Sequence, residues 1–374
     1  MIINHSKLFT KRFTKGTGEH MKAYLILEDG SVFEGTSIGA AKDTISEAVF
    51  NTSMTGCEGL LYDPSFTGQA LVMTYPLAGH IYFSGDNSNE KIWPDGIILR
   101  NISDYVIDGE HTLNDFLKIH DIPGITDIDT RALSKVIRDK GTMNCLITTN
   151  KDFNLDSIIP VLKNHKSIDA VKMTTCSDIY SIPGNGSNIS VIDLGVSKSV
   201  IHAFSKRNQA VTVYPAYSDA ETILSSNPDG VVITDGPGNP DDLGSIICEI
   251  QKIIQKNIPV FGVGLGHLLV ALAKGAESYK LKYGHRGINQ PVRFNETGRV
   301  YITVQNYGYA VKEESVEKLN ADVSFVNVND GTIEGLEYKD APIYTVQFQP
   351  ETTFGPVDTS FVYDRFIEMT GVRK

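Results

Sequence analysis

Residues whose types and spacing suggest chemistry are concentrated in the second half of the chain, above all between Val260 and His267. The pattern Gly-x-X-x-Gly from Gly262 to Gly266 is typical of an elbow, in which a strand reverses abruptly into a helix and exposes the residue between them. That residue is normally Ser or Cys, and the N-terminus of the helix stabilises its negative charge. Here it is Gly264, which has no side chain with which to attack a substrate. The same pattern also occurs where a strand and a helix merely pack closely.

A second candidate follows the apolar segment 344–348, which reads as a buried strand and ends in Gln349-Pro350-Glu351. A histidine at position 349 would serve as general base to a nucleophile, with Glu351 fixing its tautomer and orientation. Gln349 cannot replace it, because an amide does not exchange protons near neutral pH. A third candidate is the turn Asp235-Gly236-Pro237-Gly238-Asn239-Pro240, whose glycines allow backbone N–H groups to hold a carboxylate or an oxyanion. Such turns are also common as plain connections.

The elements that must position these segments are short β-rich runs alternating with helix-length segments. That rhythm predicts a parallel, doubly wound sheet, in which active sites gather at the carboxyl ends of the strands. We therefore expect the turn after Thr234 and the elbow after Gly262 to lie at one edge of the sheet. The expected strands are 189–194, 210–214, 230–234 and 259–262, and the expected helices are 197–206, 220–225 and 241–255.

The first half of the chain has a different pattern. An alternating segment, a turn at Asp29-Gly30 and a second run from 31 to 35 predict a β-hairpin. The polar stretch 181–188 interrupts all periodicity, and we predict a linker there, between a mixed α+β domain of residues 21–180 and a second domain of residues 189–374. Residues 1–20 are expected to be a disordered extension or an organelle presequence. The remaining elements expected in the first domain are strands 47–51, 69–74 and 96–99 and helices 113–119 and 130–138.

The composition argues against several classes of function. With a net charge of −11 and no basic cluster, the chain is not expected to bind nucleic acid. The longest apolar run, 258–273, is shorter than the roughly 20 residues needed to cross a bilayer, so no membrane span is expected. The cysteines lack disulfide-framework and zinc-ligand spacing, which fits a reducing compartment; they are Cys57, Cys145, Cys176 and Cys248.

In their order and spacing, the three candidate segments resemble those of the class I glutamine amidotransferases. Motifs of the first half narrow the resemblance to the small, glutaminase chain of carbamoyl-phosphate synthase, from about Met21 to the C-terminus. This resemblance implies an N-terminal α+β small-chain domain followed by a doubly wound amidotransferase domain. The motifs that carry it are Asn51-Thr52-Ser53-Met54-Thr55-Gly56, Asp127-Ile128-Asp129-Thr130-Arg131-Ala132-Leu133, Arg138-Asp139-Lys140-Gly141-Thr142-Met143, Gly236-Pro237-Gly238-Asn239-Pro240, Asn289-Gln290-Pro291-Val292 and Gln305-Asn306.

The chain departs from that family at the positions that carry its chemistry. Gly264 stands at the nucleophilic Cys, Gln349 at the general-base His, and Leu268 at a Gln that contacts the substrate. Tyr307 stands where the family usually has His after Asn, and of the triad only Glu351 is retained. Because removing triad members costs several orders of magnitude in rate, we expect glutamine hydrolysis to be lost. Leu268 would also leave polar groups unpaired, at about 1–3 kcal/mol.

Other positions match residues that contact glutamine in the family; they are Ser53, Gly236, Gly238, Leu265, Asn306, Gly308 and Tyr309. These residues are consistent with weak glutamine binding, and also with a purely structural use of the turns. The resemblance brings the loop of Cys57 near the pocket, but no second histidine motif supports this cysteine as a nucleophile. We expect His267 and His285 to be hydrogen-bonding residues rather than bases.

The resemblance also implies a large partner chain that holds ATP and a divalent metal, since this chain has no Walker-type phosphate motif. No cofactor or metal is expected on this chain. The predicted function is that of a small subunit supporting an ammonia-dependent synthase, which makes carbamoyl phosphate for pyrimidine or arginine synthesis. Two alternatives stay open: a stand-alone regulatory or glutamine-sensing pseudoenzyme, and an active glutaminase with an unrecognised nucleophile. We expect a cytoplasmic location, or the mitochondrial matrix if residues 1–20 are a presequence.

Overall fold

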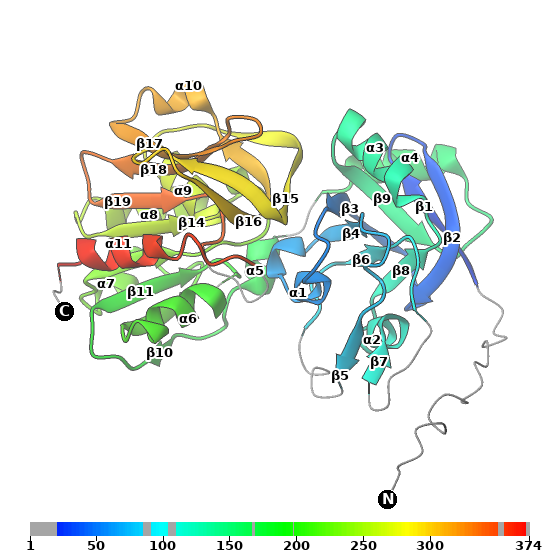
Figure 1. Cartoon of the computed structure of the whole chain (residues 1–374), viewed down its shortest axis with the longest axis horizontal. Coiled ribbons are helices and arrows are strands. Elements are labelled where there is room, and N and C mark those ends of the chain that lie inside the picture. Colours follow the sequence, from blue (N-terminus) through cyan, green and yellow to red (C-terminus); the bar gives the residue numbers. More distant parts are fainter. Residues whose placement is uncertain are drawn as a thin grey trace, which may run out of the picture.

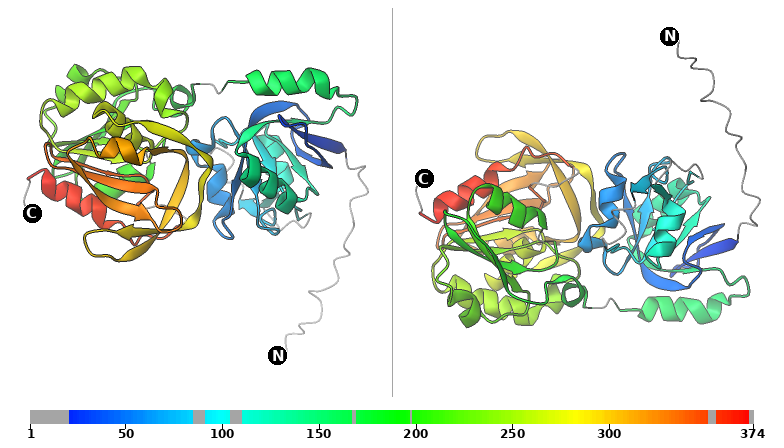
Figure 2. Two further views of the ribbon diagram at one scale, coloured as in Figure 1. Left: turned by 90° about the horizontal axis from the view of Figure 1, so that it is seen from above. Right: turned by 90° about the horizontal axis from the view of Figure 1, so that it is seen from below.

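The computed structural model describes residues 21–84, 91–103, 110–166, 169–196, 198–350 and 355–371. The chain forms two domains that lie side by side, the first coloured blue to cyan-green and the second green to red (Figure 1). The same arrangement is visible from above and from below (Figure 2). The mixed α/β architecture and the order of the two domains confirm the fold class predicted from the sequence.

The first domain is built on a closed barrel with the strand order β1-β2-β8-β6-β4-β3-β9. Its apolar interior includes Leu25 and Leu27 of β1, and α3 covers one side with the buried residues Leu133 and Ile137. Asp129 caps α3 by accepting from the backbone N–H of Ala132. The barrel strands are β1 (Lys22–Leu27), β2 (Val32–Gly39), β3 (Thr44–Asn51), β4 (Gln69–Met73), β6 (Gly96–Ile98), β8 (Pro123–Thr126) and β9 (Met143–Thr148).

The predicted hairpin is present as β1 and β2, which pair antiparallel with Leu25 opposite Phe33. Closure of the barrel was not predicted, because alternation along a strand does not say which strand pairs with which. The domain's further elements are α1 (Cys57–Leu61), η2 (Pro64–Phe66), β5 (Tyr82–Ser84), β7 (Glu110–Thr112), α2 (Leu113–Ile119), α3 (Thr130–Lys140) and α4 (Leu155–Asn164).

The second domain holds one sheet of ten strands in the order β10-β12-β11-β13-β14-β19-β18-β17-β15-β16. The strands from β12 to β19 in that order run parallel, as predicted, and antiparallel strands extend both edges. The strands are β10 (Tyr180–Ile182), β11 (Asn188–Asp193), β12 (Ala210–Pro215), β13 (Gly230–Ile233), β14 (Val260–Val263), β15 (Ser278–Phe294), β16 (Val300–Val311), β17 (Ala321–Asn327), β18 (Ile333–Tyr338) and β19 (Ile343–Val346).

Helices cover both faces of this sheet, which makes it doubly wound. One face packs on α7, α8 and α9 through residues such as Ile223, Ile250 and Leu269. The other packs on α6 and α11 through Phe204 and Phe366. The domain's helices are α5 (Ala170–Thr174), α6 (Lys198–Lys206), α7 (Ala220–Leu224), η4 (Pro240–Asp242), α8 (Gly244–Ile254), α9 (Leu265–Ala273), α10 (Glu313–Val316) and α11 (Phe361–Met369).

The chain passes from one domain to the other earlier than the predicted linker 181–188. Asn144 of the barrel donates to the carbonyl of Leu162 in α4, whereas Val171 of α5 lies in the core of the second domain. Tyr180–Ile182 forms the edge strand β10, paired antiparallel with β12. This strand could not be predicted from the sequence, because an exposed edge strand needs no continuous apolar pattern.

The long strand β15 joins the two domains. The backbone N–H of Thr142 donates to the carbonyl of Lys282 (2.8 Å), and the rings of Phe50 and Tyr283 stack with centroids 5.8 Å apart. These contacts fix the second domain against strands of the barrel. Within the described residues, no helix has both the length and the apolar character needed to span a bilayer.

Candidate functional site between the two domains

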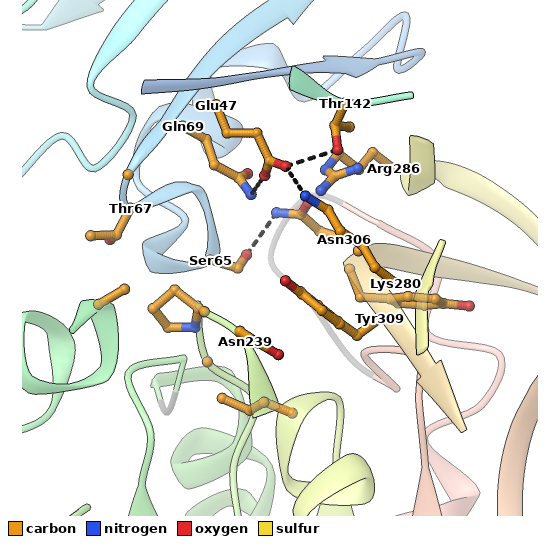
Figure 3. A pocket seen from close by; sticks show the side chains of 18 of the residues that line it. Glu47, Ser65, Thr67, Gln69, Thr142, Asn239, Lys280, Arg286, Asn306 and Tyr309 are labelled. Carbon is orange, nitrogen blue, oxygen red and sulfur yellow. Dashed lines mark hydrogen bonds and ion pairs between the residues drawn. The ribbon is translucent and has the colours of Figure 1, made fainter. Parts of the chain in front are cut away.

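A cavity of about 250 Å³ lies between the domains, at the carboxyl ends of the parallel strands. The second domain contributes the turn after β13, the start of α9 and parts of β15 and β16. The first domain contributes Glu47 of β3 and the segment 65–69 (Figure 3). The turn after Thr234 and the elbow after Gly262 therefore meet at one edge, as the strand–helix rhythm indicates.

The elbow forms between β14 and α9. Gly264 has φ 57° and ψ −116°, a backbone conformation that L-residues other than glycine rarely adopt. A Cβ atom at Gly262 would lie 2.8 Å from the carbonyl oxygen of Gly266, and one at Gly266 would lie 2.2 Å from that of Ile233. Both flanking glycines are thus required by the close approach of backbone to backbone.

The space at the apex is occupied by another side chain, that of Asp235. A Cβ atom at Gly264 would lie 2.1 Å from Asp235 Oδ1 and 2.2 Å from its Cγ. Asp235 Oδ1 accepts from the backbone N–H of Gly236 (2.8 Å) and of Leu265 (2.9 Å), and Oδ2 accepts from Gln349 Nε2 (3.0 Å). The donors that an elbow offers to an oxyanion are therefore already paired with a carboxylate.

Burial governs the ionisation of Asp235. It raises the pKa of this carboxyl to about 7, even though the hydrogen bonds from Gln349, Leu265 and Gly236 lower it, and the nearby charge of Asp63 raises it further. Sequence reasoning treated Asp235 only as the start of a turn. The feature that could have indicated its role is the position of an acidic residue at the carboxyl end of a buried strand, directly before Gly236.

Four of the predicted catalytic and binding positions converge on this carboxylate: Gly264 makes room for it, and Gly236, Leu265 and Gln349 donate to it. Gly264 offers no nucleophile, and Gln349 acts as a hydrogen-bond donor. The third predicted triad position, Glu351, lies outside the described residues.

The remaining predicted glutamine-binding residues divide into two groups. Those that line the cavity are Gly236, Gly238, Leu265, Leu268, Asn306, Gly308 and Tyr309. Ser53 is buried and is not among the lining residues; its backbone N–H donates to Asn51 Oδ1 (2.8 Å). Asn306 uses its amide to bind the other domain, donating to Ser65 Oγ (2.7 Å) and Asp63 Oδ2 (3.3 Å). Leu268 belongs to the core of the second domain.

A charged group that the sequence did not reveal forms the upper wall of the cavity (Figure 3). Lys280 Nζ lies 2.6 Å from Glu47 Oε1, and Thr142 Oγ1 donates to the same oxygen at 2.8 Å. Arg286 is 5% exposed and donates to the carbonyl of Tyr283. Burial raises the pKa of Glu47, but the charges of Lys280 and Arg286 more than offset it and hold that pKa below the usual value. The pairing crosses the domain interface, so no local spacing could indicate it.

Tyr307 is bound to a buried carboxylate. Its hydroxyl donates to Glu334 Oε1 (2.5 Å), and Glu334 is 0% exposed. His285 Nδ1 lies 2.8 Å from the same hydroxyl and Nε2 lies 2.8 Å from Asp330 Oδ2. Burial lowers the pKa of His285, but hydrogen bonding to Glu334 and the charges of Glu334 and Asp330 raise it above the usual value. Tyr307 and His285 thus hold a polar network in place.

Neither His267 nor Cys57 is among the residues that line the cavity. His267 is buried, its pKa is lowered by burial to about 3, and its Nδ1 lies 2.8 Å from Thr345 Oγ1. Cys57 is also buried, its Sγ points to the carbonyl of Ser53, and burial raises its pKa. No cysteine is found among the described residues that line the cavity.

Comparison with known proteins yields two family models that match this sequence. That of glutamine amidotransferase class-I covers residues 190–369, and that of the carbamoyl-phosphate synthase small chain, CPSase domain, covers residues 25–147. The carbamoyl phosphate synthase small chain of Listeria innocua is 42% identical over 360 residues, 94% of this chain and 98% of that protein. The one of Bacillus thuringiensis is 42% identical over 353 residues, 93% and 96% of the two chains. The similarity extends over both domains.

Proposed function

Since the chain belongs to the carbamoyl-phosphate synthase small-chain family, we propose that it is a small subunit that has lost glutamine hydrolysis and supports a large subunit working on free ammonia. The single observation that carries this proposal is the contact between Asp235 and Gly264. A carboxylate occupies the place of the nucleophile, and it takes up the hydrogen bonds that would stabilise a tetrahedral intermediate.

The chemistry of glutamine hydrolysis requires a nucleophile, a base and oxyanion donors together. At the elbow the nucleophile is absent and Gln349 stands at the position of the base. The Asp235 carboxyl group is bound to the oxyanion donors. Loss of one group leaves a slow enzyme, whereas loss of all three removes the covalent route. The contact between Asp235 and Gly264 therefore marks a site in which nucleophile, base and oxyanion donors have all changed.

In this proposal the large subunit binds ATP and a divalent metal. It makes carbamoyl phosphate from bicarbonate, ATP and ammonia. Within the described residues no group of three or more His, Cys, Asp or Glu side chains is placed to hold a metal ion. We propose a role of this chain in stabilising or regulating its partner, in the cytoplasm.

The proposal is tested with the purified chain and with its large partner. Ammonia release from glutamine by the purified chain should not exceed the control without protein; release above that control would establish the alternative of an active glutaminase. Copurification with the large chain supports the proposed subunit. A chain that stays monomeric in the presence of the large chain would instead favour the stand-alone, glutamine-sensing alternative.

A further inference from the structure

The Asp235 side chain sits at the elbow in the manner of a bound ligand. Its Oδ1 accepts from the backbone N–H groups of Gly236 (2.8 Å) and Leu265 (2.9 Å), and its Oδ2 accepts from Gln349 Nε2 (3.0 Å). Leu265 is the first residue of α9, so the helix dipole adds positive potential at this point. Only 4% of Asp235 is exposed. Its partners are donors from three separate segments of the second domain.

We propose that Asp235 is a resident carboxylate ligand of the elbow, and that the donors around it bind a free one- or two-carbon monocarboxylate once the Asp235 carboxyl group is removed. The native side chain keeps this subsite closed to acyl ligands. The inference rests on the proposed function, because it gives the physical reason for which the elbow no longer accepts the carbonyl group of a substrate.

The donors need an acceptor, because buried N–H groups are costly to leave unpaired. Shortening Asp235 would leave those of Gly236 and Leu265 facing an empty space. That space opens into the cavity between the domains, since Asp235 is one of the residues that line it. Gln347 lines the same cavity and is 1% exposed, and neither polar atom of its side chain has a partner among the described residues. The vacated subsite is therefore both polar and reachable.

The size of the ligand follows from the atoms removed. Asp235→Ala removes the carboxyl group and leaves Cβ, so formate replaces the missing atoms. Asp235→Gly removes Cβ as well, so acetate replaces the missing atoms. Each variant should prefer its own carboxylate. A general salt effect would not produce this reversal.

The test is thermal unfolding of the full-length chain with sodium formate, sodium acetate or sodium chloride at equal ionic strength. We expect formate to raise the unfolding temperature of Asp235→Ala saturably by a few degrees, more than acetate does, and the order to reverse for Asp235→Gly. Wild-type protein and Asp235→Asn should respond only as they do to chloride, because their side chains still fill the subsite. The assay contains neither glutamine nor a large chain, so its failure is separate from a failure of the proposed function.

A folded Asp235→Ala protein that responds equally to formate and chloride would overturn the inference. An equal rise in unfolding temperature of the wild-type protein and of the variant on addition of formate would also overturn it. If neither shortened variant folds, the test is a pH titration of the wild-type chain followed by NMR. The chemical shifts of the backbone amide protons of Gly236 and Leu265 should then change together, with one apparent pKa. Two amides that titrate independently, or not at all, would contradict the presence of a shared carboxylate partner.

Discussion

Asp235 Oδ1 lies 2.1 Å from the position that a Cβ atom would take at Gly264. The two residues are 29 positions apart in the sequence, and each determines what the other can be. With the Asp235 side chain in this conformation, a side chain at the apex and the carboxyl group that follows β13 exclude one another, because no non-bonded pair of atoms approaches so closely. Glycine at position 264 is therefore a steric requirement of the present site as well as a missing reagent.

Restoring the thiol alone is expected to fail. Gly264→Cys places a Cβ atom against the Asp235 carboxyl group, and Gln349 supplies no base. We predict ammonia release from glutamine equal to the control without protein, together with a lower unfolding temperature than wild type. Efficient ammonia release by Gly264→Cys would show that the site was not lost as a unit.

A double-mutant cycle measures the contact between positions 235 and 264. Gly264→Ala should destabilise the native protein through both its backbone strain and its contact with Asp235. When Asp235→Ala is also present, the strain and the contact with the Cβ atom of residue 235 (2.7 Å) persist, but the closer contacts with Oδ1 and Cγ are gone. We predict a coupling free energy of about 1–3 kcal/mol from denaturant unfolding of the four proteins. Strictly additive effects would mean that the Asp235 side chain does not occupy the apex.

The raised pKa of Asp235, about 7, makes a prediction for stability against pH. Between pH 4 and 7 the folded chain retains a proton that the unfolded chain has lost, so this group lowers the unfolding free energy as pH rises, by up to about 1.4 kcal/mol per pH unit. The effect is complete above pH 7. The charge of the nearby Asp63 carboxyl also acts on Asp235. Asp63 is present both in the wild-type protein and in the variant Asp235→Asn, with which it is compared below.

Asp235→Asn removes this titration. Its side-chain oxygen still accepts from Gly236 and Leu265, and the Gln349 amide can turn to present its oxygen. The difference in unfolding free energy between variant and wild type should therefore grow in favour of the variant from pH 4 to pH 7. Parallel curves over that range would indicate that Asp235 titrates near its ordinary value.

Tyr307→Phe tests the buried network around Glu334. The variant removes the hydroxyl that donates to Glu334 Oε1, while Gln305 and Asn327 continue to donate to the same oxygen. We predict a loss of about 1.5–3 kcal/mol in unfolding free energy, since the hydrogen bond to Glu334 is lost and His285 Nδ1 loses its contact with the hydroxyl. Tyr301→Phe, which removes a hydroxyl from a ring that lies tilted against Phe361, serves as the control and should be close to neutral. Equal losses from the two variants would argue against a special role for the Tyr307 hydroxyl.

Glu47→Ala tests the charge pairing between the domains. It leaves the buried Arg286 without the carboxylate that favours its charged form, and we predict a loss of about 3 kcal/mol. The matched control is Glu34→Ala, which breaks an exposed pair with Lys22 and should be close to neutral. A Glu47→Ala protein as stable as the control would show that Arg286 does not depend on Glu47.

Local features of the site could be predicted from the sequence because they are encoded within a few residues. The glycines at 262 and 266 specify the elbow, and the strand–helix rhythm places it beside the turn that begins at Gly236. The occupant of the elbow could not be predicted in this way, since Asp235 follows β13 whereas the elbow follows the neighbouring strand β14, and only the pairing of the two strands brings them together.

The same limit applies between the domains. Glu47 reads as one polar residue in an apolar strand, and Arg286 as one residue of a long strand; only the packing of β15 against the barrel brings them to the same cavity. The edge strand β10 and the closure of the barrel depend likewise on pairings between distant segments. The family resemblance indicated which residues of the elbow depart from the family pattern, and the structure places the Asp235 carboxyl group beside them.

Whether glutamine hydrolysis is lost can be measured by carbamoyl phosphate synthesis in the complex of this chain with its large partner, supplied with either glutamine or ammonium. We predict product from ammonium and none above background from glutamine. Synthesis from glutamine at a rate comparable to that from ammonium would contradict it.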